Sequence, residues 1–179
     1  MVSAKRKEST DGRDHSEGID VDDSLSFFIM PADAISSLRE ELIITDGEAI
    51  ANDILYRYGV KCGAGMAKKM AIQCTDLECI GEMFHVLWTQ VGLGRMSVHT
   101  IEKDRIIVTF EDSVEAQQVG TTGTLSCHFT TGYITGMVSG ILGTRFEGKE
   151  LECISRGDPY CVHEIYKARD VNLWKTREW

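Results

Sequence analysis

The residues best suited to chemistry are cysteines in the C-terminal third of the chain. Cys153 and Cys161 flank the turn sequence RGDPY, and pairing of the flanking strands would bring their two thiols together. A third thiol, Cys127, lies in the expected opening turn of a helix, where the helix dipole favours a thiolate. Three thiolates joined by one carboxylate would form a tetrahedral metal site.

The remaining cysteines, Cys62, Cys74 and Cys79, match no ligand spacing, and we expect buried or free thiols. The N-terminal sequence MVSAKRKESTDGRDHSEG lacks the apolar core of a secretory signal, which favours a cytoplasmic protein. In a reducing compartment, cysteine clusters bind metals or react more often than they form disulfides.

Composition narrows the class of protein. The chain has 179 residues, about one domain, and a net charge of -9, which disfavours direct binding of nucleic acid. The uncharged run 116–144 is rich in Gly, Thr and Ser, which disfavours a membrane span. The sequence contains no dinucleotide fingerprint, P-loop or nucleophile elbow, so it favours a non-enzymatic function.

Helices must position these residues. Apolar residues repeat at helical spacing after Asp33 and again after Asp46, and Gly59 is the expected end of the second helix. A further helix opens with the capping pair Thr75 and Glu78. We expect the apolar stripe of that helix to belong to the core.

Two β-hairpins are expected around a last helix. From Met96 the apolar period changes to two, and later RFEGKELECIS, RGDPY and CVHEIYKA indicate strand, turn and strand. The helix between them carries Gly132, Gly136 and Gly140. Each interior glycine costs about 0.5–1 kcal/mol relative to alanine, so close approach of a second backbone or a ligand is expected. The order of elements predicts an α+β domain with helices packed on an antiparallel sheet.

Domain boundaries follow from polarity. Residues 1–24 are polar and mixed in charge, which predicts a flexible tail. The apolar run LSFFIM begins the domain, which we expect to span residues 25–170. Residues 171–179, with Trp174 and Trp179, form a C-terminal extension.

The pattern E-x-x-C, seven residues, then C, within KELECISRGDPYCVHEI, resembles the 4-vinyl reductase-type (4VR) domain family. The resemblance implies the α+β fold of nitric-oxide-signalling ligand-binding domains and TRAPP vesicle-tethering subunits, which commonly form homodimers. In zinc-containing sensory members the metal is held by a helix-start cysteine, the glutamate of E-x-x-C and the two later cysteines. The equivalent residues here are Cys127, Glu150, Cys153 and Cys161.

Several alternatives remain open at this cluster. In a regular strand Cys153 shares a face with Leu151, so either a bulge turns Glu150 toward the cysteines or the ligand is Glu152. His163 stands where relatives have an aromatic residue, and it could support the ligands from behind or compete as a ligand. An iron–sulfur cluster is the alternative to zinc, because thiolates suit both.

The resemblance implies a stand-alone sensory domain that binds a small hydrophobic molecule, such as an aromatic compound. The alternatives are an accessory protein or reductase acting on tetrapyrrole vinyl groups, and a redox-responsive or iron–sulfur interaction module. A ligand pocket would be lined by apolar residues of two helices and the sheet, namely Phe84, Trp88, Val108, Phe129, Tyr133 and Met137. Candidates for its polar contact are His85, His99 and Tyr133.

Overall fold

The computed structural model describes residues 30–69, 74–91 and 93–169. The predicted tail 1–24 and extension 171–179 lie outside these ranges. In chain order the elements are α1 (Ala34–Asp46), α2 (Glu48–Lys69), α3 (Leu77–Val91), β1 (Met96–Glu102), β2 (Arg105–Phe110), α4 (Val114–Val119), α5 (His128–Leu142), β3 (Phe146–Glu152), the 3-10 helix η1 (Ile154–Arg156) and β4 (Cys161–Lys167).

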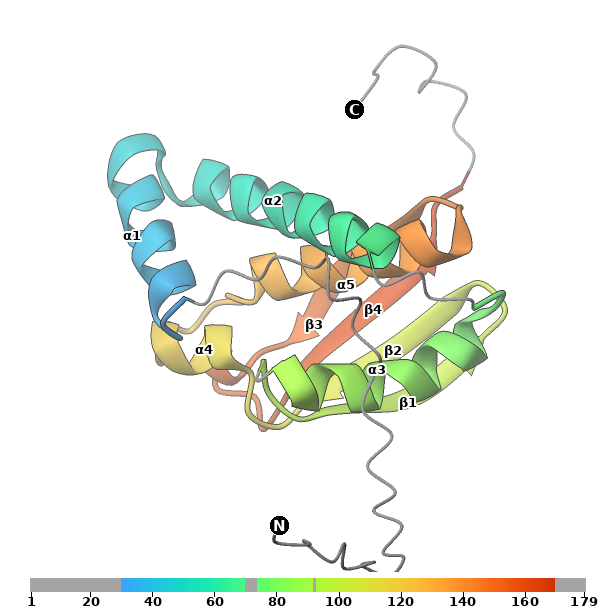
Figure 1. The fold of residues 1–179 in the computed structure, drawn as a ribbon. Coiled ribbons are helices and arrows are strands. Elements are labelled where there is room, and N and C mark those ends of the chain that lie inside the picture. The colour runs from blue at the N-terminus through green and yellow to red at the C-terminus, as the bar shows by residue number, and fades with distance from the viewer. Residues whose placement is uncertain (1–29, 70–73, 92, 170–179) are drawn as a thin grey trace, which may run out of the picture.

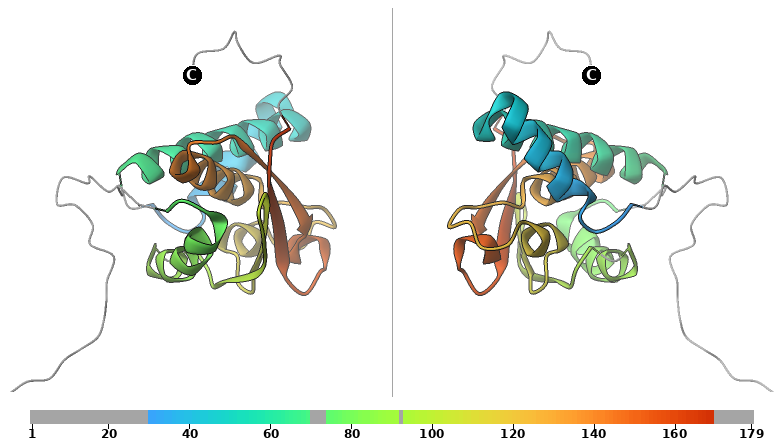
Figure 2. Two further views of the ribbon diagram at one scale, coloured as in Figure 1. Left: turned by 90° about the vertical axis from the view of Figure 1, so that its right-hand side faces the viewer. Right: turned by 90° about the vertical axis from the view of Figure 1, so that its left-hand side faces the viewer.

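The four strands form one antiparallel sheet in the order β1-β2-β4-β3. Helix α5 packs against β3, α3 packs against β1, and α2 lies along α5 (Figure 1). Figure 2 shows α3 and α5 on the same side of the sheet. Alternate residues of β2, Ile106, Val108 and Phe110, are fully buried beneath them. The predicted α+β class, with helices on an antiparallel sheet, is confirmed.

The three glycines of α5 face the backbone of α2. A Cβ atom at Gly132 would overlap the carbonyl oxygen of Tyr56, and one at Gly136 would overlap that of Val60. At Gly140 a Cβ would lie 2.8 Å from the Cβ of Ala67. The expected close approach of a second backbone is therefore confirmed, and that backbone belongs to α2.

Helix α2 carries matching glycines of its own. A Cβ at Gly59 would overlap the carbonyl oxygen of Phe129, and one at Gly63 would overlap that of Tyr133. The prediction that Gly59 ends this helix is wrong, because α2 continues to Lys69. Gly59 is needed for contact with α5, which outweighs its low helix propensity.

Helix α1 is turned with polar residues inward. Its buried residues are Ser36 and Arg39, and the Arg39 guanidinium donates to Glu48 Oε1 at 2.8 Å. In contrast, Ile44 is 77% exposed and Leu38 is 41% exposed. An apolar stripe normally faces the core, so this helix presents an unusual apolar surface to its surroundings.

Cys74 and Cys79 form a disulfide, which corrects the expectation of buried or free thiols at these positions. The backbone N–H of Cys79 donates to Asp76 Oδ1 at 3.0 Å, and this capping turn folds Cys74 back toward the start of α3. Cys62 is a free, half-buried thiol on α2. None of the helices within the described ranges is long and apolar enough to span a membrane.

The glycine contact gives a direct stability prediction. Gly136→Ala should destabilise the protein by about 1–3 kcal/mol, because the added methyl group must displace the α2 backbone. Urea denaturation measures the change. Gly65→Ala is the control, since no described atom lies within 4 Å of its Cβ position. That control should be neutral or stabilising by about 0.5–1 kcal/mol, and equal losses in both variants would contradict the packing described.

Candidate metal centre and aromatic cluster

One thiol before α5 and two on the second hairpin meet with a carboxylate. Cys127 is the N-cap residue of α5, Glu150 lies on β3, Cys153 follows β3, and Cys161 begins β4. One ligand atom from each residue lies within 4.8 Å of all the others. The three cysteines are free and buried. The structure thus brings together all four residues that the resemblance implied.

A bulge decides which glutamate reaches the cysteines. The β3–β4 pairing shifts register between Glu150 and Glu152. Glu150 Oε2 accepts the backbone N–H of Cys127 at 3.0 Å, whereas Glu152 is exposed. Of the two alternatives, the bulge with Glu150 inward is the one observed.

The sulfur spacing suits a single metal ion. The Sγ–Sγ distances are 3.9 Å for Cys127–Cys153, 3.6 Å for Cys127–Cys161 and 3.8 Å for Cys153–Cys161. A tetrahedral ion about 2.3 Å from each sulfur spaces the sulfurs about 3.8 Å apart. Glu150 Oε1 is also buried without a hydrogen-bond partner among the described residues, so a fourth donor remains available. This cluster could therefore bind a metal ion.

The four acidic groups oppose one another's ionisation. Contacts with the Cys127 and Cys161 thiols lower the pKa of Cys153, while contact with Cys153 raises that of Cys127. Burial, followed by contact with Cys153, raises the pKa of Glu150 to about 9. For Cys161, contact with Cys127 lowers the pKa, but contact with Cys153 and burial raise it to about 12. By itself the cluster therefore holds one negative charge, on Cys153, and three protons.

Each sulfur also meets a polar group from the surrounding chain. Ser113 Oγ lies 3.3 Å from Cys127 Sγ, and Ser126 Oγ lies 3.5 Å from Cys153 Sγ. The backbone N–H of Ile154 donates to Cys161 Sγ at 3.4 Å. Hydrogen bonds of this kind orient metal ligands and stabilise their charge.

Glu115 is a functional residue that the sequence analysis missed. It is buried on α4, and its two oxygens accept the backbone N–H groups of Phe129 and Thr130 at 3.0 and 2.8 Å. Burial raises its pKa to about 7, although these hydrogen bonds act in the opposite direction. Glu115 therefore fixes the start of α5, immediately after Cys127. Only its position next to the uncharged run marked it in the sequence.

His163 lies beside the cluster and outside the group of four donors. Its Nδ1 is 2.9 Å from Thr131 Oγ1, and Thr131 Oγ1 donates to the Cys127 carbonyl at 2.6 Å. Burial lowers the pKa of His163 to about 4. Among the two predicted roles, this position fits support of Cys127 from behind, through Thr131.

The predicted pocket residues form an aromatic cluster between α3, α5 and the sheet. The Trp88 ring centroid lies 6.3 Å from Phe84 and 5.5 Å from Tyr133, and Phe129 lies 5.8 Å from Tyr133. Val108 and Met137 are buried in the same core as Trp88, Phe84 and Phe110. Burial raises the pKa of Tyr133 to about 12.

Trp88 carries a buried polar group. Its side chain is 1% exposed, and Nε1 has no hydrogen-bond partner among the described residues. Of the other polar candidates, His99 is exposed on β1, and the side chain of His85 lies outside the described set.

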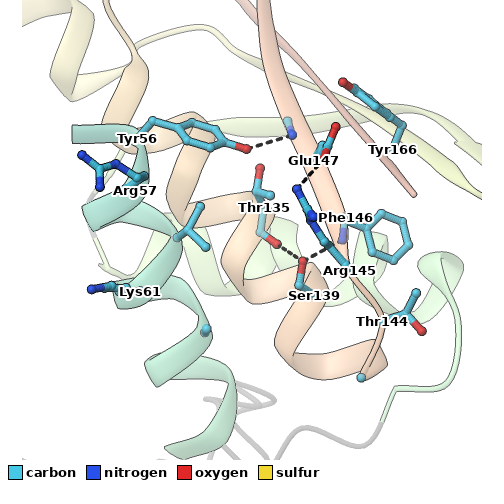
Figure 3. A pocket seen from close by; sticks show the side chains of 14 residues that line it. Tyr56, Arg57, Lys61, Thr135, Ser139, Thr144, Arg145, Phe146, Glu147 and Tyr166 are labelled. Atoms are coloured by element: carbon cyan, nitrogen blue, oxygen red, sulfur yellow. Dashed lines mark hydrogen bonds and ion pairs between the residues drawn. The ribbon is translucent and has the colours of Figure 1, made fainter. Parts of the chain in front are cut away.

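A separate cleft of about 790 Å³ lies between α2, the end of α5 and β3 (Figure 3). The Tyr56 hydroxyl at its edge accepts the backbone N–H of Gly148 at 3.1 Å, and Arg145 reaches along β3 to Glu147. None of the six predicted pocket residues lines this cleft.

The fold and its sequence define a ligand-sensing class of α+β domain. Residues 106–167 match the 4-vinyl reductase (4VR) domain, and residues 14–104 match the family described as activator of aromatic catabolism. The second match covers more than half of the chain, so the protein belongs to this family of aromatic-catabolism activators. The resemblance to the 4VR family is thereby confirmed. No curated protein matches the chain.

Solved structures have a similar fold. The phenol-responsive sensory domain of the transcription activator PoxR, with phenol, has a TM-score of 0.67 and 26% identity over 83% of this chain and 79% of that one. A trafficking protein particle complex subunit 3 from Naegleria fowleri, covalently bound to palmitic acid, has a TM-score of 0.61 and 17% identity over 77% and 93%. A vinyl-4-reductase family protein from Methanocaldococcus jannaschii has a TM-score of 0.49 and 16% identity over 80% and 99%.

Proposed function

We propose that this chain is a sensory domain that binds a small aromatic molecule between α3, α5 and the sheet. Its family and its similarity to a phenol-bound sensory domain support an aromatic ligand. The observation that carries the proposal is Trp88, an indole N–H buried in an aromatic cluster without a described partner.

The energetics of Trp88 favour a ligand with an oxygen atom. A buried donor without an acceptor costs about 1–3 kcal/mol. An apolar site with one or two placed polar groups is typical of small-molecule pockets. Phe84 and Tyr133 supply ring faces on either side of the indole, and a ligand oxygen would supply its acceptor.

We propose zinc as the metal at the cysteine cluster. Three thiolates and Glu150 form a closed set of four protein ligands, as in structural rather than catalytic zinc sites. The ion would join the start of α5 to the β3–β4 hairpin. The sulfurs lie 3.6–3.9 Å apart, which leaves no room for the several iron and sulfide atoms of a cluster.

We further propose that α1 pairs with a second copy of the chain. Leu38 and Ile44 are exposed on α1, and Ile50 is 51% exposed at the start of α2. A two-fold interface is self-complementary, so an apolar patch can bury itself against its own copy. Exposed apolar patches of this kind mark interaction sites.

Phenol tests the sensory proposal. Phenol should raise the melting temperature, because a ligand at 100 times its Kd adds about 2.7 kcal/mol of stability. Trp88→Phe should weaken phenol binding about tenfold, the equivalent of one lost hydrogen bond. Tyr160→Phe, which removes an exposed hydroxyl group, should leave the affinity unchanged. No shift with any of a broad panel of aromatics would rule the proposal out.

Metal content tests the zinc proposal. Elemental analysis should give one zinc per chain and a colourless protein, and Cys153→Ser should lose the metal and lower the melting temperature. Cys62→Ser should keep the full zinc content, since Cys62 lies outside the cluster. Iron in place of zinc, or substoichiometric metal in reduced protein, would contradict the assignment.

Light scattering over a range of concentrations tests the pairing of α1. The wild-type chain should have the mass of a dimer, and Ile44→Asp should shift it toward the monomer by burying a charge in the interface. Ser37→Asp, an exposed position on the same helix, should remain dimeric. A wild-type chain that is monomeric at every concentration would remove the basis for this interface.

A further inference from the structure

The hydrogen bonds around His163 determine which of its ring nitrogens carries the proton. Thr131 Oγ1 has one proton, and it donates that proton to the Cys127 carbonyl at 2.6 Å. Towards His163 Nδ1, 2.9 Å away, Thr131 can therefore only accept. Nδ1 must carry the hydrogen, and Nε2 is left with a lone pair, which makes it a hydrogen-bond acceptor.

This acceptor lies in the aromatic cluster. His163 is fully buried, and Nε2 has no donor among the described residues. The His163 ring packs edge-on against Phe110 at 5.3 Å, and Trp88 packs against the same Phe110 at 5.4 Å. A buried acceptor on β4 and a buried donor on α3, both without described partners, thus share one aromatic neighbour.

Only some ligands can satisfy both groups. A hydrocarbon offers neither a donor nor an acceptor, and an ether offers an acceptor alone. A hydroxyl group donates one hydrogen bond and accepts others. Sites that hydrogen-bond a hydroxyl strongly reject analogues without it, because their own polar groups are then left unpaired.

We propose that His163 selects the ligand by accepting the proton of an aromatic hydroxyl group, while Trp88 donates to the oxygen of the same group. The ligand class is therefore a phenol rather than an aromatic hydrocarbon or ether. This inference rests on the proposed sensory function, because it names the polar group of the same site. It gives a purpose to a histidine that replaces the aromatic residue of similar domains.

Calorimetric titration with phenol, anisole and toluene tests the selection. The wild-type protein should bind phenol at least tenfold more tightly than anisole, which keeps the oxygen but lacks the proton. In His163→Phe the phenol preference should fall to about twofold or less, and toluene should bind at least as well as before. His163→Gln, whose side-chain carbonyl can accept, should restore part of the preference.

Two controls separate selection from damage to the fold. His99→Phe, at an exposed position on β1, should keep the wild-type preference. Thr131→Val keeps the shape but removes the acceptor for Nδ1–H, so the phenol preference should fall without loss of metal. It replaces His163→Phe if that variant does not fold.

The outcomes distinguish this inference from the proposed function. Unchanged phenol preference in both His163→Phe and Thr131→Val would show that a bound water, not the ligand, satisfies Nε2. Equal wild-type affinity for phenol, anisole and toluene would also overturn the selection by His163 and leave aromatic binding intact. Failure of all three compounds to bind would remove both proposals.

Discussion

Three thiols and a carboxyl group, buried within contact of one another, impose the main electrostatic constraint on this structure. Acidic groups at such distances cannot all ionise without a cation, because each charge raises the cost of the next. The constraint acts at the joint between α5 and the β3–β4 hairpin, since Cys127 precedes the helix and Cys153 and Cys161 flank the hairpin turn. The bulge that turns Glu150 inward follows from the same geometry.

Helix α5 carries the consequences of that joint through the molecule. Its glycines lie against the backbone of α2, and its aromatic residues Phe129 and Tyr133 lie in the cluster around Trp88. Glu115 holds its first N–H groups, and Thr131 connects the Cys127 carbonyl to His163. A shift of α5 would therefore alter the metal ligands and the aromatic cluster together.

Spacing made much of this architecture predictable. The period of two identified both hairpins, and the four-residue glycine interval correctly implied a close backbone. The motif around Glu150, Cys153 and Cys161 selected the residues that meet, but strand alternation alone could not choose between Glu150 and Glu152. That choice depended on the bulge, which arises from tertiary pairing.

Other features depend on information that a local pattern lacks. Apolar spacing in α1 indicates a helix with an apolar side, but does not reveal that Ser36 and Arg39 face inward. Helix propensity suggested a stop at Gly59, because the distant partner that requires glycine was unknown. The Cys74–Cys79 disulfide and the buried Glu115 likewise depend on how separate segments fold together.

The glycine contact between α2 and α5 has a consequence for the order of folding during synthesis. Glycines weaken α2 as an isolated helix, and its partner glycines on α5 follow almost half a chain later. At about 5–20 residues per second, α2 leaves the ribosome several seconds before α5. During that interval its narrow glycine face is uncovered, so completion of the fold waits for the segment that also brings the cysteines together.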